Sequence, residues 1–266
     1  MSESEILVLG GVHGNEPFGV ELVRSLQESP VQGVDALIAN ERAVEAGERF
    51  IDTELSAYSD PTGNSYEDQR LAELIKVGAD YRLILDFHNA ADATTYEAWM
   101  YAPAEALRKP VQWLLGVASI RYVITFNPDL PLYTALPQTV AIEQGLPTQG
   151  YQTWEGQQIT RWRSVLQQMA RIGLDNLQPA PSQDITHLEL MGDISREQAK
   201  HAGLEAFADL QQYDSLPSEA AASLGLEPGA YRIVCWAYHN LSKLVPGTNG
   251  EREYWGQVGR ELNKSA

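Results

Sequence analysis

Cysteine and positive charge are both scarce in this sequence. Its 266 residues include one cysteine, Cys235, so the chain cannot form an internal disulfide bond. Lysine and arginine together number 19, against 36 aspartate and glutamate residues, and the formal net charge at pH 7 is −17. Because a negative field repels nucleic acid and anionic membranes, we expect neither as a partner.

Long apolar runs are missing as well. No run approaches the length of about 20 residues that crosses a bilayer. Residues 1–5 are acidic and lack the features of a signal peptide, so we expect a soluble, cytoplasmic protein. The apolar fraction of 44% is enough for the core of one large domain or of two unequal ones. Nothing in the composition distinguishes a monomer from a homo-oligomer.

Apolar residues in the first 175 positions alternate between strand-length runs and helical spacing. The predicted strands are residues 6–9, 34–39, 81–89, 94–101, 122–126 and 139–145. The predicted helices are residues 17–28, 66–78, 103–119 and 159–172, and residues 41–50 fit a loop or a short helix. Strand–helix–strand order of this kind predicts a largely parallel sheet with right-handed crossovers.

A stretch rich in proline, residues 178–182, is the best linker in the chain. We therefore predict a first domain over residues 1–178 and a second over residues 183–266. Strands at 187–191 and 231–238, with a helix at 195–206, predict that the second domain is small and β-rich.

Side chains that can bind a metal follow the ends of predicted strands. His13 and Glu16 follow the first strand, His88 ends a later one, and Glu143 ends another. The carboxyl ends of parallel strands are the usual place for ligands in open α/β sheets. A catalytic zinc takes three protein ligands and keeps a fourth position for water. A lone His-x-x-Glu is weak evidence, but its conjunction with two further strand ends predicts a metal site.

Several of these segments resemble one family. Residues 10–16, Gly-Gly-Val-His-Gly-Asn-Glu, resemble the first zinc motif of the succinylglutamate desuccinylase/aspartoacylase family, relatives of the zinc carboxypeptidases. Residues 86–89 resemble its second zinc motif, and residues 141–145 resemble the segment that holds its catalytic Glu. Residues 49–52 resemble the segment with its carbonyl-polarising Arg, and residues 251–255 its late segment with a substrate-contacting Tyr.

The resemblance implies a three-layer α/β/α catalytic domain with a carboxypeptidase-like mixed sheet, followed by a small C-terminal β-rich domain. It also implies one Zn2+ per chain, bound by His13, Glu16 and His88. Glu143 would be the general base, and Arg49 would polarise the substrate carbonyl. Tyr254 is the implied substrate contact. Two further residues, Asp86 and Asn89, could either orient the ligand His88 or be ordinary turn residues.

The chain departs from the family where substrate is recognised. Ser56 and Ala57 stand where the family has an Asn-Arg pair that binds the substrate carboxylate, and Tyr133 stands where aspartoacylases have a further Arg. Ser56 and Tyr133 are therefore candidate substrate-binding residues with altered chemistry. Since a bidentate Arg is hard to replace, we expect an acyl substrate with fewer negative charges. Another arginine could still supply the anchor; the candidates are Arg42, Arg70 and Arg161.

The best-supported function is a zinc-dependent hydrolase that cleaves an N-acyl amide, or an ester, of a small molecule with metal-activated water. One alternative is a carboxypeptidase-like metallopeptidase, against which the loss of the Asn-Arg pair argues. Another is a zinc-binding module without turnover. Glu143 and Arg49 argue against it, because zinc binding alone requires neither side chain.

Overall fold

The structure is a computed structural model of the 266-residue chain. It describes residues 4–90, 98–103, 109–118, 120, 122–126, 130–145, 151–179, 186–195, 198, 201–202, 215–236 and 254–262. None of the described helices combines the length and hydropathy needed to span a membrane.

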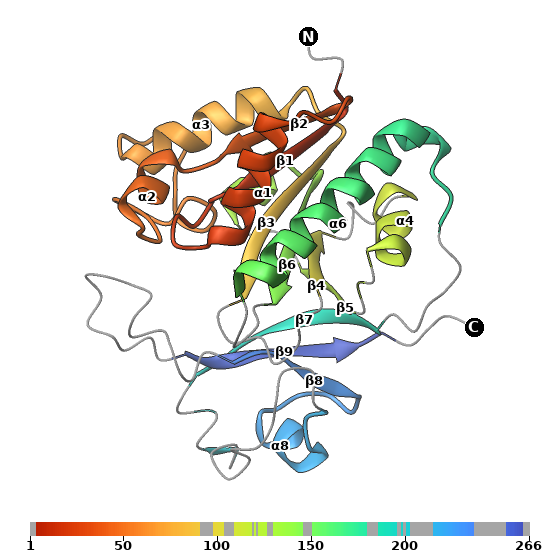
Figure 1. The fold of residues 1–266 in the computed structure, drawn as a ribbon. Helices are drawn as coiled ribbons and strands as arrows, with labels where there is room; N and C mark the ends of the chain where they lie inside the picture. The colour runs from red at the N-terminus through yellow and green to blue at the C-terminus, as the bar shows by residue number, and fades with distance from the viewer. Residues whose placement is uncertain are drawn as a thin grey trace.

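Helices and strands alternate through the first two thirds of the chain (Figure 1). They are β1 (Ile6–Gly10), α1 (Pro17–Glu28), β2 (Val34–Ile38), α2 (Glu41–Ala46), α3 (Tyr66–Gly78), β3 (Leu83–Ala90), β4 (Ala98–Pro103), α4 (Lys109–Val117), β5 (Tyr122–Phe126), α5 (Pro131–Ala135), β6 (Thr139–Gly145), α6 (Tyr151–Ile172) and the 3-10 helix η2 (Leu174–Asn176). The later elements are β7 (Thr186–Ser195), α8 (Ser218–Ser223), β8 (Tyr231–Trp236) and β9 (Tyr254–Glu261).

The strands form a nine-stranded mixed sheet in the order β2-β1-β3-β6-β4-β5-β7-β9-β8. The four strands from β2 to β6 are parallel, and β4 runs antiparallel to β6. Beyond β4, strands β5 and β7 continue in the direction of β4, and β9 is antiparallel to both β7 and β8. The mixed sheet expected from the sequence is confirmed.

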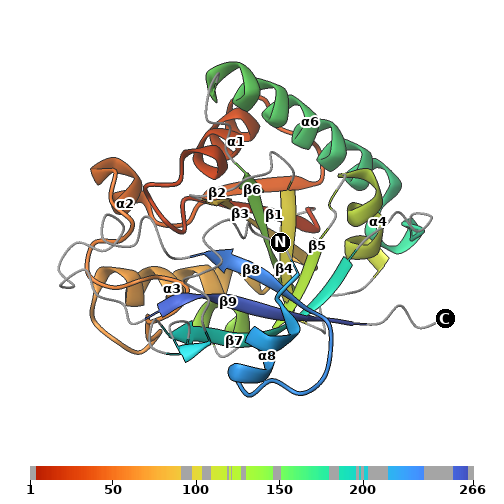
Figure 2. The same cartoon turned by 90° about the horizontal axis from the view of Figure 1, so that it is seen from below.

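Helices cover both faces of this sheet, because successive residues of a buried strand point to opposite sides. On β1, Ile6 and Val8 pack into a core with side chains of α1, α4 and α6. The intervening Leu7 and Leu9 pack into a second core with side chains of α3 and α5. Figure 2 shows α1, α4 and α6 on one side of the strands and α3 on the other. The predicted three-layer α/β/α arrangement is therefore confirmed.

Most helix and strand boundaries in the first half agree with the sequence prediction. The helices α1 and α3 have the predicted bounds, whereas α6 begins at Tyr151 rather than at residue 159. The short helix α5 was not predicted, because its five residues are too few to show periodicity. Residues 94–97, 104–108 and most of 196–206, which belong to predicted elements, lie outside the described residues.

The C-terminal strands extend the sheet of the first half through the parallel pairing of β5 with β7. Around β8 and β9 lies a separate core, whose buried members include Leu216, Ala220, Tyr231, Ile233 and Val258. This part of the chain is β-rich, as expected. The domain boundary between residues 178 and 183 stays a prediction.

Candidate metal centre

The loop after β1 follows a path that glycine makes possible. Strand β1 ends at Gly10, and helix α1 crosses so close that a Cβ atom on Gly10 would lie 2.1 Å from the backbone oxygen of Gly19. The next residue, Gly11, has a φ of 70°, a left-handed conformation that glycine adopts without strain. This close packing and sharp turn bring His13 and Glu16 to the carboxyl end of the sheet.

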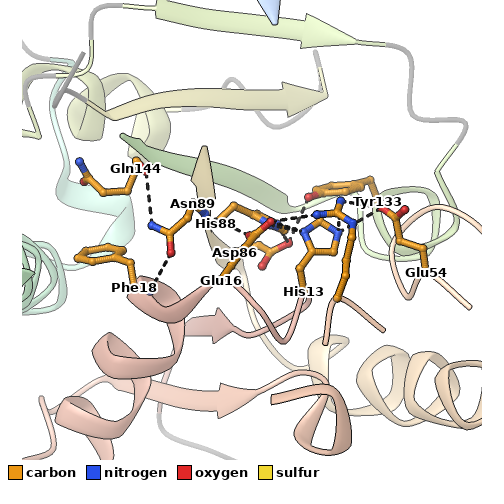
Figure 3. A network of polar contacts seen from close by, with 10 residues as sticks. His13, Glu16, Phe18, Glu54, Asp86, His88, Asn89, Tyr133 and Gln144 are labelled. Carbon is orange, nitrogen blue, oxygen red and sulfur yellow. Dashed lines mark hydrogen bonds and ion pairs between the residues drawn. The ribbon is translucent and has the colours of Figure 1, made fainter. Parts of the chain in front are cut away.

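His13, Glu16 and His88 converge on one another, as predicted (Figure 3). Oε1 of Glu16 lies 2.8 Å from Nδ1 of His13, and Oε2 of Glu16 lies 2.9 Å from Nδ1 of His88. The two Nδ1 atoms are 3.2 Å apart. Both imidazoles are buried, with exposed fractions of 7% for His13 and 4% for His88. The three side chains form the one candidate metal cluster found among the described residues.

The far side of each imidazole faces a carboxylate. Nε2 of His88 lies 2.8 Å from Oδ2 of Asp86, and Nε2 of His13 lies 3.2 Å from Oε1 of Glu54. An Nε2–H that donates to a carboxylate leaves Nδ1 with a free lone pair. For His88, whose Nε2 faces Asp86, this tautomer presents the Nδ1 lone pair to the Glu16 carboxylate, an arrangement that favours a cation between them. Nε2 of His13 also lies 2.9 Å from Nη2 of Arg49, which is a donor as well.

The spacing of these atoms fits zinc. Zinc–nitrogen bonds of about 2.0–2.1 Å in a tetrahedron place two nitrogen ligands about 3.3 Å apart. The observed separation of the Nδ1 atoms of His13 and His88 is 3.2 Å. A carboxylate that fixes the far nitrogen of a metal-binding histidine is a common feature of zinc sites. The donor set and its geometry therefore fit one zinc ion.

The electrostatics of the cluster also favour a cation. Burial raises the pKa of Glu16, but His13 and His88 outweigh it and hold the pKa well below its usual value, so Glu16 is a carboxylate. Burial lowers the pKa of His88. The negative charges of Asp86 and Glu16 outweigh this effect and hold the pKa well above its usual value. Positive charge, either a proton or a metal ion, is thus strongly stabilised between these groups.

Asp86 and Asn89, which flank His88, have different partners. Oδ2 of Asp86 accepts hydrogen bonds from His88 and from the hydroxyl of Tyr133, at 2.8 and 3.1 Å. Oδ1 of Asn89 accepts from the backbone N–H of Phe18 at 2.9 Å, in the first turn of α1. The backbone N–H of Asn89 also donates to Glu16 at 3.1 Å. Both residues are therefore more than turn formers, since each orients a group of the cluster or the helix beside it.

Arg49 reaches the cluster from the loop after α2. Its Nη1 donates to Oε1 of Glu16, and its Nη2 to Oε1 of Glu54, both at 3.2 Å. Nη2 also lies 2.9 Å from Nε2 of His13. The side chain is 20% exposed, so its guanidinium lies at the edge of the site rather than within the core.

Glu54 is a member of the site that the sequence reasoning missed. Burial raises its pKa, but hydrogen bonds from His13 and Arg49, with the charges of both, lower it to about 2. The available signal was its position, two residues before Ser56 in the segment compared with the family.

A second missed residue is Glu67, in the first turn of α3. Its carboxylate is fully buried and binds the loop between Arg49 and Glu54. The donors are the backbone N–H groups of Ile51 at 2.7 Å, Asp52 at 3.0 Å and Thr53 at 3.2 Å, and the Asn40 side chain at 3.1 Å. No sequence motif marked this residue, because its partners lie 14 to 27 positions away.

Glu143 lies beside the cluster on the neighbouring strand. In the pairing of β3 with β6 it is in register with His88, so the two side chains project from the same face of the sheet. Burial, assisted by the Glu16 carboxylate, raises the pKa of Glu143 to about 7 against the opposing effect of His88. Such a group exchanges protons readily at neutral pH.

The predicted substrate-binding residues occupy different places. Ser56 is buried, and its backbone oxygen accepts from Leu132 at the start of α5 at 3.4 Å. Tyr133 is buried behind Asp86, and Tyr254 begins β9. Substrate binding by Ser56, Tyr133 and Tyr254 stays a prediction.

The three arginines considered as replacement anchors bind elsewhere. The guanidinium of Arg42 lies 4.5 Å from the centre of the Tyr66 ring. Arg70 donates to the backbone oxygens of Ile38 and Ala39, both at 3.0 Å. Arg161 donates to the backbone oxygen of Ala118. Each guanidinium is thus engaged with groups outside the cluster.

Residues 2–145, more than half of the chain, match the family model described as Succinylglutamate desuccinylase/Aspartoacylase catalytic domain. The chain is also similar to proteins of Xenopus laevis and Xenopus tropicalis named N-acyl-aromatic-L-amino acid amidohydrolase (carboxylate-forming). The identities are 33% and 32% over 104 residues, which cover 32% of this chain and 34% of each relative. The chain therefore spans about a third of the length of these curated relatives.

Solved structures share the fold. The succinylglutamate desuccinylase from Chromobacterium violaceum superposes with a TM-score of 0.68 at 17% identity, over 99% of this chain and 86% of that one. Murine aminoacylase 3 superposes with a TM-score of 0.57 at 19% identity, over 73% of each chain. At these identities the likeness concerns the α/β fold alone. Because the family model matches more than half of its residues, this chain belongs to the succinylglutamate desuccinylase/aspartoacylase family.

Proposed function

We propose that the protein is a zinc-dependent hydrolase that cleaves the N-acyl amide bond of a small molecule. The observation that carries the proposal is the convergence of His13, Glu16 and His88 beside Glu143. The names of the Xenopus relatives, which are amidohydrolases, favour an amide over an ester as the bond that is cleaved.

His13 and His88 would bind the ion through Nδ1, and Glu16 through its carboxylate. When bound, zinc supplies a Lewis acid that lowers the pKa of water from about 15.7 to about 7. Asp86 holds the imidazole of His88 in the tautomer that this binding requires, and Glu54 contacts the far nitrogen of His13.

Glu143 is the proposed general base. It takes a proton from the attacking water as the new carbon–oxygen bond forms, and it passes that proton to the nitrogen as the carbon–nitrogen bond breaks. Its pKa is about 7 without metal, and a bound cation would lower it, so at neutral pH Glu143 would be a carboxylate that can accept the proton.

Arg49 is the proposed partner of the substrate carbonyl. Its guanidinium already lies beside the cluster, where it binds Glu16 and Glu54. Rotation toward the carbonyl oxygen would let it stabilise the negative charge that develops there during attack.

The substrate proposed for this site lacks an α-carboxylate. Four carboxylates lie in or beside the cluster, namely Glu16 within it and Glu54, Asp86 and Glu143 around it. Apart from the two histidines of the cluster, the basic side chain in contact with these carboxylates within the described part of the chain is Arg49. A substrate carboxylate bound there without a further cation would pay a desolvation cost of several kcal/mol.

The test is a hydrolysis assay of the zinc-loaded protein on a panel of N-acyl amino acids, their amides, the corresponding esters and short peptides. We expect the amide bond of a neutral N-acyl compound to be cleaved fastest. Cleavage restricted to C-terminal residues of peptides would indicate a carboxypeptidase instead. Binding of zinc without turnover on any compound of the panel would indicate the module without activity.

A further inference from the structure

Tyr133 occupies a position at which a substrate contact was expected, yet its hydroxyl faces into the protein. It is 5% exposed and packs in the core beneath the sheet with side chains of α3 and α5. Its hydroxyl donates to Oδ2 of Asp86 at 3.1 Å (Figure 3). Asp86 lies on the side of His88 away from Nδ1, the atom that faces Glu16.

We propose that Tyr133 is a positioning residue for the metal site, which acts through Asp86 on His88. The inference rests on the proposed function, since it assumes that His88 binds zinc. Tyr133 would then hold a metal ligand in place at the position where aspartoacylases bind substrate.

The hydrogen bond from Tyr133 matters because the buried carboxylate of Asp86 has few donors. Asp86 is fully buried, and its Oδ1 has no hydrogen-bond partner among the described residues. Oδ2 therefore receives both donors, His88 at 2.8 Å and Tyr133 at 3.1 Å. A buried carboxylate with so few donors depends strongly on each one.

Tyr133 fixes the position of Asp86, and Asp86 in turn fixes the orientation of His88. With the Tyr133 hydroxyl in place, Oδ2 of Asp86 cannot turn away from His88 without losing a hydrogen bond in the core. A fixed Oδ2 holds the proton on Nε2 of His88 and sets the plane of its ring. Nδ1 is then aimed at Glu16 and His13, which is the direction in which it can bind metal.

The test compares Tyr133→Phe with the wild-type protein in zinc affinity, measured by competition with a chelator. We expect affinity to fall about 10-fold or more, the range typical for partners of metal-binding histidines. The visible spectrum of the Co2+-substituted protein should also change, because it reports ligand geometry. Tyr81→Phe is a matched control, since its hydroxyl also donates to an aspartate, Asp35, at 2.7 Å. That variant should leave zinc affinity and the Co2+ spectrum unchanged.

A second variant tests whether Asp86 transmits the effect. Asp86→Asn should weaken zinc binding by itself, and adding Tyr133→Phe should weaken it little further, because both changes break the same chain of contacts. Independent, additive losses would overturn the proposal. Wild-type zinc affinity in Tyr133→Phe with a raised KM would overturn it too, and would make Tyr133 a substrate contact. Absence of zinc binding by the wild-type protein would instead refute the proposed function itself.

Discussion

At the scale of single residues, the site is built from pairs in which a carboxylate fixes an imidazole. Asp86 does so for His88 and Glu54 for His13. The same electrostatics that stabilise an added proton on His88 would stabilise a zinc ion in its place. This arrangement makes the effects of individual substitutions predictable.

The wild-type protein should bind about one zinc per chain, as three protein ligands and one open position imply. The double variant His13→Ala/His88→Ala removes two of the ligands and should lose the metal. Elemental analysis of both purified proteins measures this. His201→Ala is the control, because His201 is exposed and lies outside the cluster. Stoichiometric zinc in the double variant would refute the assigned ligands.

Glu143→Gln should keep zinc and lose activity by about a hundredfold or more, the scale of a lost general base. In the wild-type protein kcat/KM should rise with pH as Glu143 loses its proton. The metal-free pKa is about 7, and a bound cation would lower it by stabilising the carboxylate. A pH–rate profile of both proteins tests this, since the limb that belongs to Glu143 should vanish in the variant. Near-normal turnover would exclude Glu143 as the base.

Glu54→Gln should destabilise the metal-free protein at pH 7 by about 1–3 kcal/mol, because it removes a charged acceptor from His13 and Arg49. The folded-state pKa of Glu54 is lowered from 4.5 to about 2. Its contribution to stability is therefore fully present above pH 4.5 and is lost as the pH falls toward 2. Urea unfolding at several pH values should show the difference between wild type and variant shrinking below pH 4.5. A difference that is independent of pH would contradict the assignment.

At the scale of elements, the loop from Arg49 to Glu54 is held by helix α3 through a single side chain. Glu67 at the start of α3 binds three consecutive backbone N–H groups of this loop. A helix that packs by its apolar face on the sheet therefore also places Arg49 and Glu54.

Glu67→Gln should lower stability by about 1–3 kcal/mol, because one carboxylate oxygen becomes a donor that faces other donors. Hydrogen exchange of the amides of residues 51–53 should become faster. We also expect kcat/KM to fall, since Arg49 is carried by the loosened loop. Glu73→Gln on the same helix is the control, because Glu73 is 59% exposed and pairs with Arg70. Equal effects of the two substitutions would show that Glu67 has no special role in the loop.

At the scale of the whole molecule, charge should influence which substrates enter. The net charge of −17 repels anions, and the carboxylates of the site add to this locally. We expect kcat/KM for the amide of an N-acyl amino acid to exceed that for the free acid. Added salt should narrow the difference by screening the long-range repulsion. A clear preference for the free acid would show that a cation binds the carboxylate after all.

Patterns within short stretches of sequence determined much of this protein. Apolar periodicity predicted the bounds of α1 and α3, and the residues after strand ends predicted that His13, Glu16 and His88 would lie together. Such signals are local, because periodicity reports which face of an element is buried and glycines report a sharp turn. The motifs also sufficed to indicate the family.

The tertiary structure alone decided which distant side chains meet. Glu54 reaches His13 across 41 positions, and Tyr133 reaches Asp86 across 47. The attachment of β7 to β5 joins the C-terminal strands to the first sheet. Contacts of this kind depend on how helices and loops pack across the sheet, and no local pattern of residue types records that packing. The grouping of His13, Glu16 and His88 could therefore be predicted from sequence, and Asp86 could be named as a possible neighbour of His88, whereas the contacts of Glu54 and Tyr133 could not.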